Sequence, residues 1–268
     1  MKIFDSHCHL DDKSYEGDIE AVVNRARNAG VTHMTIIGIN KRTSSRAVSL
    51  AESFEGVFAT VGVHPHDAKN CNASVLNYLR DLSKNPKVVA WGETGLDFNR
   101  MYSPIQDQER WFVKQLEMAD ELGLPLIFHE RDSQGRFLEI LRDHPSRKRR
   151  GVVHCFSGSG KDLDQYLETG FYIGITGIVT MSTRGVNLRK LVPRIPAQRL
   201  LVETDAPYLV PAPEKSRTRR NEPAFVKSVL LKLAEVRGED PEKLADVIWE
   251  NTCRFYRINQ TVEGPGCF

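Results

Sequence analysis

Short apolar runs alternate with longer segments of mixed polarity along the whole chain. The runs are rich in Val and Ile, and their length suits strands that are buried on both faces of a parallel sheet. They are KIFDSH, THMTIIGI, VFATVGVH, VVAWGE, PLIFH, GVVHCF, FYIGITG and LLVETD. The pattern therefore predicts eight buried strands.

The segments that separate these runs carry apolar residues at helical spacing. The predicted helices cover residues 18–29, 106–122, 163–169, 222–237 and 241–256. Each of the first three is followed by a glycine, which is typical of a helix C-terminus. Repeated strand-then-helix units imply right-handed crossovers and a parallel sheet, and eight units close a TIM barrel. An open doubly wound sheet is the alternative, but eight units are more than it usually needs.

Length and composition agree with one barrel. The chain has 268 residues, of which 40% are hydrophobic and 27% are charged. A TIM barrel takes about 250 residues, and these fractions are ordinary for a globular protein. Because no repeat, linker or low-complexity tract interrupts the chain, we expect a single domain over residues 1–258 and a C-terminal tail over 259–268. The net charge of +2 neither requires nor excludes an anionic partner.

The cysteines and the hydropathy pattern bear on the compartment. The five cysteines, at positions 8, 71, 155, 253 and 267, include no CxxC pair, which favours free thiols in a reducing compartment. No stretch approaches the 18 or so apolar residues of a membrane span, and the N-terminus has no long apolar segment. We therefore expect a cytoplasmic protein without a membrane span, and no obligate protein partner is indicated.

Metal-competent side chains recur where the predicted strands end. His7 and His9 are two residues apart, so both imidazoles point to the same side of an extended strand. The remaining candidates each end an apolar run, where an unpaired charge or imidazole would be costly to bury. The carboxyl ends of barrel strands converge on one face, where active sites lie. The predicted metal ligands are His7, His9, Glu93, His129, His154 and Asp205.

This set of imidazoles and carboxylates, without thiolates, suits Zn, Mn or Mg. Six ligands exceed the need of one open tetrahedral site, so we predict two divalent cations bridged by Glu93. The other ligands then divide into His7, His9 and Asp205 for one ion and His129 and His154 for the other. Two ions about 3.5–4 Å apart can activate water and stabilise both oxygens of a phosphoryl transfer. Glu93 and Asp205 are the predicted catalytic residues, with Asp205 able to accept the proton of the attacking water.

Other polar residues near the predicted mouth are candidates for substrate contacts. His64 and His66, in the motif GVHPH, are expected to contact a substrate phosphate rather than to add metal ligands; a structural role in the loop is the alternative. Arg131 is placed to clamp a phosphate oxygen, or to form an ion pair with its neighbour Asp132.

A group of arginines follows the eighth predicted strand on the same side of the barrel. Arg217, Arg219 and Arg220 either bind a nucleic-acid backbone or form a solvated loop. A second basic cluster, residues 147–150, precedes the sixth strand and therefore lies at the opposite end of the barrel.

Several longer motifs follow one another in order from residue 1 to about residue 225. They are DSHCHLDD, TVGVHPHDA, GETGLDFNR, LPLIFHERD, VVHCFSG, YIGITGIV and LLVETDAPYLVP. In these motifs the chain resembles the TatD family of metal-dependent hydrolases. The resemblance implies a TIM barrel, a pair of divalent metals and hydrolysis of phosphodiester bonds, with DNA, single-stranded or at 3′ ends, as the substrate. Carried over by motif, the implied ligands are the same six residues, with Glu93 shared.

Other activities fit the same scaffold, because one barrel hosts many reactions. The alternatives are hydrolysis of another ester or amide, by an aminoacyl-ester deacylase or a small-molecule amidohydrolase, and a non-catalytic binding module. The arginines favour a substrate with phosphates, and the intact ligand set argues against a non-catalytic protein. The sequence assigns no role to Glu130 or to the tail with Cys267.

Overall fold

Eight parallel strands form one barrel in a computed structural model that describes residues 1–258. The strands follow one another around the sheet in chain order, and a parallel bridge between Cys8 and Ala206 joins the first strand to the segment after the last. They are β1 Ile3–Cys8, β2 Val31–Ile36, β3 Val57–Val61, β4 Val88–Asp97, β5 Leu126–Arg131, β6 Gly151–Val153, β7 Tyr172–Ile175 and β8 Leu200–Val202. The predicted TIM barrel is confirmed. The predicted tail, 259–268, lies outside the described residues.

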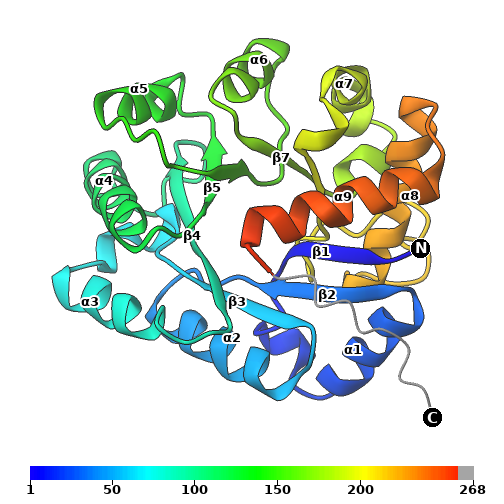
Figure 1. The fold of residues 1–268 in the computed structure, drawn as a ribbon, viewed down its shortest axis with the longest axis horizontal. Helices are drawn as coiled ribbons and strands as arrows, with labels where there is room; N and C mark the ends of the chain where they lie inside the picture. Colours follow the sequence, from blue (N-terminus) through cyan, green and yellow to red (C-terminus); the bar gives the residue numbers. More distant parts are fainter. Residues whose placement is uncertain (259–268) are drawn as a thin grey trace.

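Helices surround the strands, as Figure 1 shows. They are α1 Ile19–Asn28, α2 Lys41–Ser53, α3 Ala73–Leu82, α4 Ile105–Leu122, α5 Arg136–Asp143, α6 Gly160–Glu168, α7 Gly185–Leu191, α8 Val226–Arg237 and α9 Pro241–Tyr256. The helix expected from residue 222 begins later, at Val226, after a short 3₁₀ turn over Pro223–Phe225. The Glu222 side chain does not cap this segment, because it accepts two hydrogen bonds from Arg25 instead.

The amino-terminal end of the barrel is closed by apolar side chains. Phe4, inside the barrel, packs against Tyr256 at the end of α9, with 5.7 Å between ring centroids. The Tyr256 hydroxyl donates to the Ser6 carbonyl over 2.7 Å, and Phe255 packs edge-on against Tyr172. This packing leaves the opposite end, where the strands finish, as the end that carries the polar residues of the site.

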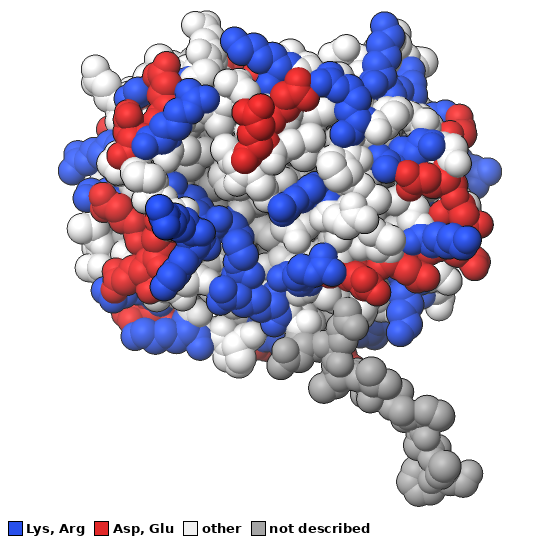
Figure 2. All heavy atoms as spheres, turned by 45° about the horizontal axis from the view of Figure 1, so that its top comes forward, with Lys and Arg blue, Asp and Glu red and all other residues white. Residues whose placement is uncertain are grey.

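Figure 2 shows one face of the molecule, on which Lys and Arg side chains are interspersed with Asp and Glu. This mixed surface agrees with the small net charge. Within residues 1–258, no helix is both long enough and apolar enough to cross a membrane.

Candidate active site

The six predicted ligands meet at the carboxyl ends of the strands. The Nε2 atoms of His7 and His9 are 3.3 Å apart. Asp205 Oδ1 lies 3.4 Å from His9 Nε2 and 3.6 Å from His7 Nε2. These three side chains therefore form the first of the two groups predicted from the sequence.

Glu93 stands between this group and the second one. Its Oε2 lies 3.5 Å from His7 Nε2. Its other oxygen, Oε1, lies 2.8 Å from His129 Nδ1 and 3.5 Å from His154 Nε2. One carboxylate oxygen thus faces each group, which is the arrangement that a bridging ligand requires.

The spacing of the donor atoms fits metal binding. Ligands at about 2.0–2.1 Å from a common ion in a tetrahedral site lie about 3.3–3.4 Å from one another. The separations among His7, His9 and Asp205 run from 3.3 to 3.6 Å, and Glu93 adds two contacts of 3.5 Å. Nitrogen atoms facing each other at this distance are readily explained when both lone pairs point at one cation. The residues therefore fit a divalent metal.

The backbone around Glu93 requires glycine at the preceding position. Gly92 has a φ of 140°, and a Cβ there would lie 2.6 Å from the Ile127 carbonyl oxygen. Only glycine adopts this conformation without strain. Because Gly92 has no side chain, β4 can also approach β5 closely, and Glu93 then lies between the two groups.

Asp205 lies just beyond β8, in a left-handed conformation with a φ of 54°. Its backbone N–H donates to the His7 carbonyl over 2.9 Å. Aspartate and asparagine adopt this region more readily than most residues, although it still carries some strain. The turn fixes the Asp205 carboxylate beside His7 and His9.

The electrostatics of the cluster keep the bridging carboxylate ionised. Burial opposes the charge of Glu93, but the positive field of His154 and the hydrogen bonds from His129 and His64 outweigh it and hold the pKa of Glu93 well below its usual range. Burial, reinforced by His154, keeps the pKa of His7 well below normal. For His129, burial is outweighed by hydrogen bonds to Asp97 and Glu93, which raise its pKa to about 9. Hydrogen bonds of His129 and His154 to the surrounding carboxylates fix the rings of the second group.

Two buried carboxylates that the sequence analysis missed support the second group. Glu203 Oε1 accepts a hydrogen bond from His154 Nδ1 over 2.9 Å, which leaves the Nε2 of that histidine facing Glu93. Asp97 Oδ2 lies 3.2 Å from His129 Nε2, so the Nδ1 of His129 faces Glu93. Metal-binding histidines typically donate their other ring N–H to a carboxylate in this way.

Glu203 itself is fixed by its surroundings. The backbone N–H of Cys155 donates to its Oε1 over 2.6 Å. Gly174 on β7 leaves room for the carboxylate, since a Cβ at that position would lie 2.6 Å from Glu203 Oε2. Glu203 therefore orients His154 rather than contacting substrate.

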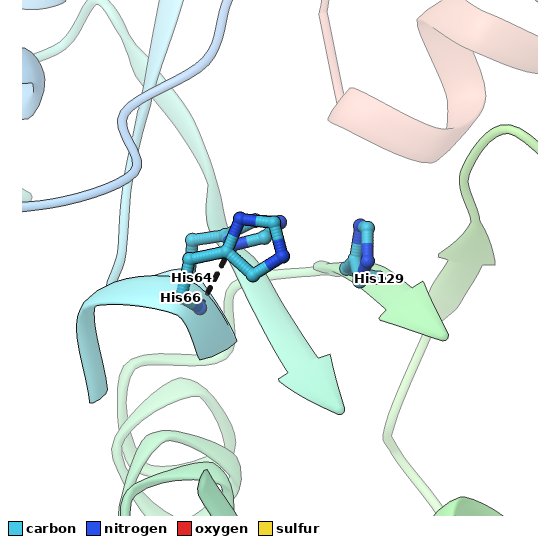
Figure 3. Close-up of side chains that lie close together, drawn as sticks. All are labelled: His64, His66 and His129. Atoms are coloured by element: carbon cyan, nitrogen blue, oxygen red, sulfur yellow. Dashed lines mark hydrogen bonds between the residues drawn. The ribbon is translucent and has the colours of Figure 1, made fainter. Parts of the chain in front are cut away.

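His64 and His66 lie at the edge of this cluster, close to His129 (Figure 3), where His64 caps the short 3₁₀ helix Pro65–Asn70 after β3 and His66 lies in its first turn. The backbone N–H of His66 donates to His64 Nδ1 over 3.0 Å, which places the proton of a neutral His64 on Nε2. That nitrogen faces Glu93 Oε1 at 3.4 Å. Burial lowers the pKa of His64 to about 4, so its ring is neutral. His66 Nε2 instead lies 2.7 Å from Asp97 Oδ2.

The predicted substrate arginines are in two different environments. Arg131, Arg217 and Arg219 are exposed. Arg220, in contrast, donates to both oxygens of Asp18 over 2.8 and 2.6 Å and to the Ser14 carbonyl. These contacts tie Arg220 to the loop before α1, so they do not favour its predicted role in substrate binding.

The neighbours of Arg131 also have defined contacts. The ion pair considered between Arg131 and Asp132 is not formed in the described part of the chain; Asp132 Oδ2 accepts from Asn99 instead. Glu130 points away from the metal-competent cluster. Its carboxylate accepts from the Ser133 backbone N–H and hydroxyl and from the Tyr166 hydroxyl, so it organises the loop before α5.

Fold and site together define a metal-dependent hydrolase of the TIM-barrel class. A profile of the family described as TatD related DNase matches residues 4–257. The chain belongs to this family, as its motifs predicted.

Relatives of known name support the same assignment. The chain is 43% identical over 259 residues to the 3′-5′ ssDNA/RNA exonuclease TatD of Pectobacterium parmentieri, covering 96% of this chain and 100% of that protein. It is 42% identical to the protein of the same name from Escherichia fergusonii, with the same coverage. Among solved structures, YJJV, a TatD homolog from Escherichia coli, superposes with a TM-score of 0.88 at 30% identity, covering 96% of this chain and 98% of that one.

Proposed function

We propose that this chain is a metal-dependent exonuclease that removes nucleotides from the 3′ end of single-stranded DNA or RNA with the help of two divalent cations. The observation that carries the proposal is the position of Glu93, with one oxygen toward each group of ligands. The substrate and the direction are those named for relatives that match the chain over nearly its whole length.

His7, His9 and Asp205 would hold one ion, His129 and His154 the other, and Glu93 both. The ions would be Mg, Mn or Zn, which accept imidazole and carboxylate ligands. When bound, they would make a water more acidic and offset the negative charge that develops on the phosphate oxygens.

Asp205 is the carboxylate best placed to move a proton. Its side chain is 15% exposed, whereas that of Glu93 is 3% exposed. An Oδ atom of Asp205 therefore reaches the side from which a water and a substrate approach, and it can accept the proton of the attacking water. The more deeply buried Glu93 serves to hold the ions.

Neutral and charged donors are available for the phosphate oxygens. His64 carries its proton on Nε2, toward the centre of the cluster. Arg131 extends from the end of β5 and is exposed, so its guanidinium is free to turn toward a bound phosphate.

A release assay tests this function. A single-stranded oligonucleotide labelled at its 5′ end should shorten stepwise in Mg²⁺ or Mn²⁺, and the same strand labelled at its 3′ end should release a labelled mononucleotide first. EDTA should abolish both. Failure to cleave either strand in Mg²⁺, Mn²⁺ or Zn²⁺, together with hydrolysis of an aminoacyl ester or a small amide, would replace the nuclease with the alternative hydrolase.

A further inference from the structure

Two aromatic side chains near the site are unusually exposed. Tyr102 is 55% exposed and Tyr208 is 54% exposed. Among the aromatic residues of positions 1–258, the only other one classed as exposed is Tyr78, at 38%. Large rings are normally well covered in a folded protein, and exposed tyrosines are common where a surface binds a partner or ligand.

The two tyrosines stand on opposite sides of the metal-competent cluster. Tyr102 follows β4 and Tyr208 follows β8, and these strands are half a turn apart in an eight-stranded barrel. The Tyr102 ring lies 4.8 Å from that of His66, and the Tyr208 ring lies 5.9 Å from that of His9. A row of histidine rings connects the two tyrosines, and the centroids of neighbouring rings are between 3.7 and 6.2 Å apart. In order from Tyr208 to Tyr102, these are His9, His7, His154, His129 and His66.

The backbone next to each ring is held in place. Beside Tyr102, the Ser103 hydroxyl donates to the His66 carbonyl over 2.8 Å and accepts from the Lys69 N–H over 3.0 Å. The Tyr208 N–H donates to the Asp205 carbonyl over 2.9 Å, and its own carbonyl accepts from Asn221 over 2.6 Å. The rings are thus exposed on ordered backbone, which reduces the entropy lost when a ligand binds.

We propose that Tyr102 and Tyr208 are the two walls of a nucleobase-binding site, each stacking one of the last two bases of a single strand. This inference rests on the proposed function, since the phosphate between those two nucleotides would lie over the cluster that separates the tyrosines. Every base has a π-face, so such a site holds any sequence. Paired bases within a duplex are already stacked and cannot reach both rings, so the site selects unpaired 3′ ends.

Equilibrium binding tests this without any cleavage. Fluorescence anisotropy with the metal-loaded protein compares an oligothymidylate whose last linkages are phosphorothioates, which resist cleavage, with strands of the same kind that carry a tetrahydrofuran abasic unit at the last or the penultimate position. On the full strand, Tyr102→Ala and Tyr208→Ala should each weaken binding about tenfold, since stacking on one aromatic ring is worth this order of affinity. Tyr102→Phe and Tyr208→Phe should bind like the wild type, because the ring is retained.

The abasic strands identify the partner of each ring. Each abasic strand should bind the wild-type protein about tenfold more weakly than the full strand. With one of the two strands, Tyr102→Ala should cause little further loss of affinity. With the other strand, Tyr208→Ala should cause little further loss. Tyr78→Ala is the matched control, because Tyr78 is also an exposed tyrosine but contacts Lys41 and Ser45, which are not part of the site.

Either of two results overturns the inference. The first is that the alanine variants bind like the wild type, and the second is that their losses add in full to the losses from the abasic units. The proposed function fails separately, in the release assay, if the wild-type protein cleaves no strand when metal is present.

Discussion

The two groups of metal-competent residues differ in what lies behind their histidines. In the second group, His154 donates to Glu203 and His129 donates to Asp97. Both carboxylates are almost completely buried. They fix the orientation of the rings and increase the basicity of the nitrogens that face Glu93.

The first group has no such support for His7. Its Nε2 faces His9, Glu93 and Asp205, but its buried Nδ1 has no hydrogen-bond partner among the residues that the structure describes. The neighbouring Asp205 is more exposed than either supporting carboxylate and lies on a left-handed turn. This half of the site is therefore less preorganised.

The difference suggests a division of labour between the two groups. We expect the ion held by His129 and His154 to bind more tightly and the ion held by His7, His9 and Asp205 to exchange more readily. The half with the weaker ion is also the half that carries the proposed proton acceptor.

Glu93→Gln should remove the connection between the halves and produce the largest effect. Neutralising the bridge leaves two cations repelling each other at short range. Losing both ions would remove several kcal/mol of transition-state stabilisation, which corresponds to about a thousandfold or more in rate. Metal titration by calorimetry should show the loss of both ions, whereas His7→Ala should affect mainly one. Retention of both ions and of near-normal turnover by the Gln variant would mean that Glu93 is not the bridge.

Asp205→Asn tests the first group alone. Asparagine tolerates the same left-handed backbone, but its amide cannot accept the proton of the attacking water and is a weaker ligand. General-base assistance is typically worth about 10²–10⁴-fold, so kcat at saturating metal should fall by this factor. If the loss is below tenfold, Asp205 has no part in the proton transfer.

Glu203→Gln tests the supported half. The substitution keeps the shape of the side chain but weakens the acceptor for His154, so affinity for one ion should fall by about 10–100-fold while the other ion is little affected. Glu130→Gln is the matched control, since that carboxylate contacts Ser133 and Tyr166 instead. Equal metal affinities for the two variants would show that Glu203 does not support the site.

The smallest effect concerns the arginines of the loop after β8. Replacing Arg217 and Arg219 with alanine should weaken binding of single-stranded DNA and reduce its salt slope by up to about 1.4 units, at about 0.7 per phosphate contact. Arg147 and Lys148, which are also exposed but precede β6 at the other end of the barrel, provide a control with the same change of charge. If both double variants bind with the same slope, the loop after β8 is only a solvated surface.

Most of the fold and the convergence of the six candidate ligands were predictable because each depends on a local pattern. Buried parallel strands are continuous apolar runs, and a polar residue at the end of such a run stands out. The missed residues needed information that a single run does not contain. Asp97 was missed because β4 continues to that residue, four beyond Glu93, where the apolar pattern is interrupted by Thr94 and Gly95.

Contacts between distant segments were also hidden from the sequence. In the sequence, Glu203 stands between the last strand, β8, and Asp205. Only its contacts with His154, just beyond β6, and with Gly174 on β7 show that it supports His154. Likewise, nothing local distinguishes Arg220 from Arg217 and Arg219. Its partner Asp18 is about 200 positions away in the chain, in the segment before α1.

Metal stoichiometry tests the central claim most directly. The wild-type protein, stripped with chelator and reloaded with Mn²⁺ or Zn²⁺, is analysed for metal after removal of the excess. Because the six ligands divide into two groups that share Glu93, we predict close to two equivalents of metal per chain, with two distinguishable affinities in a titration. A firm maximum of one equivalent under saturating conditions would contradict the two-metal site.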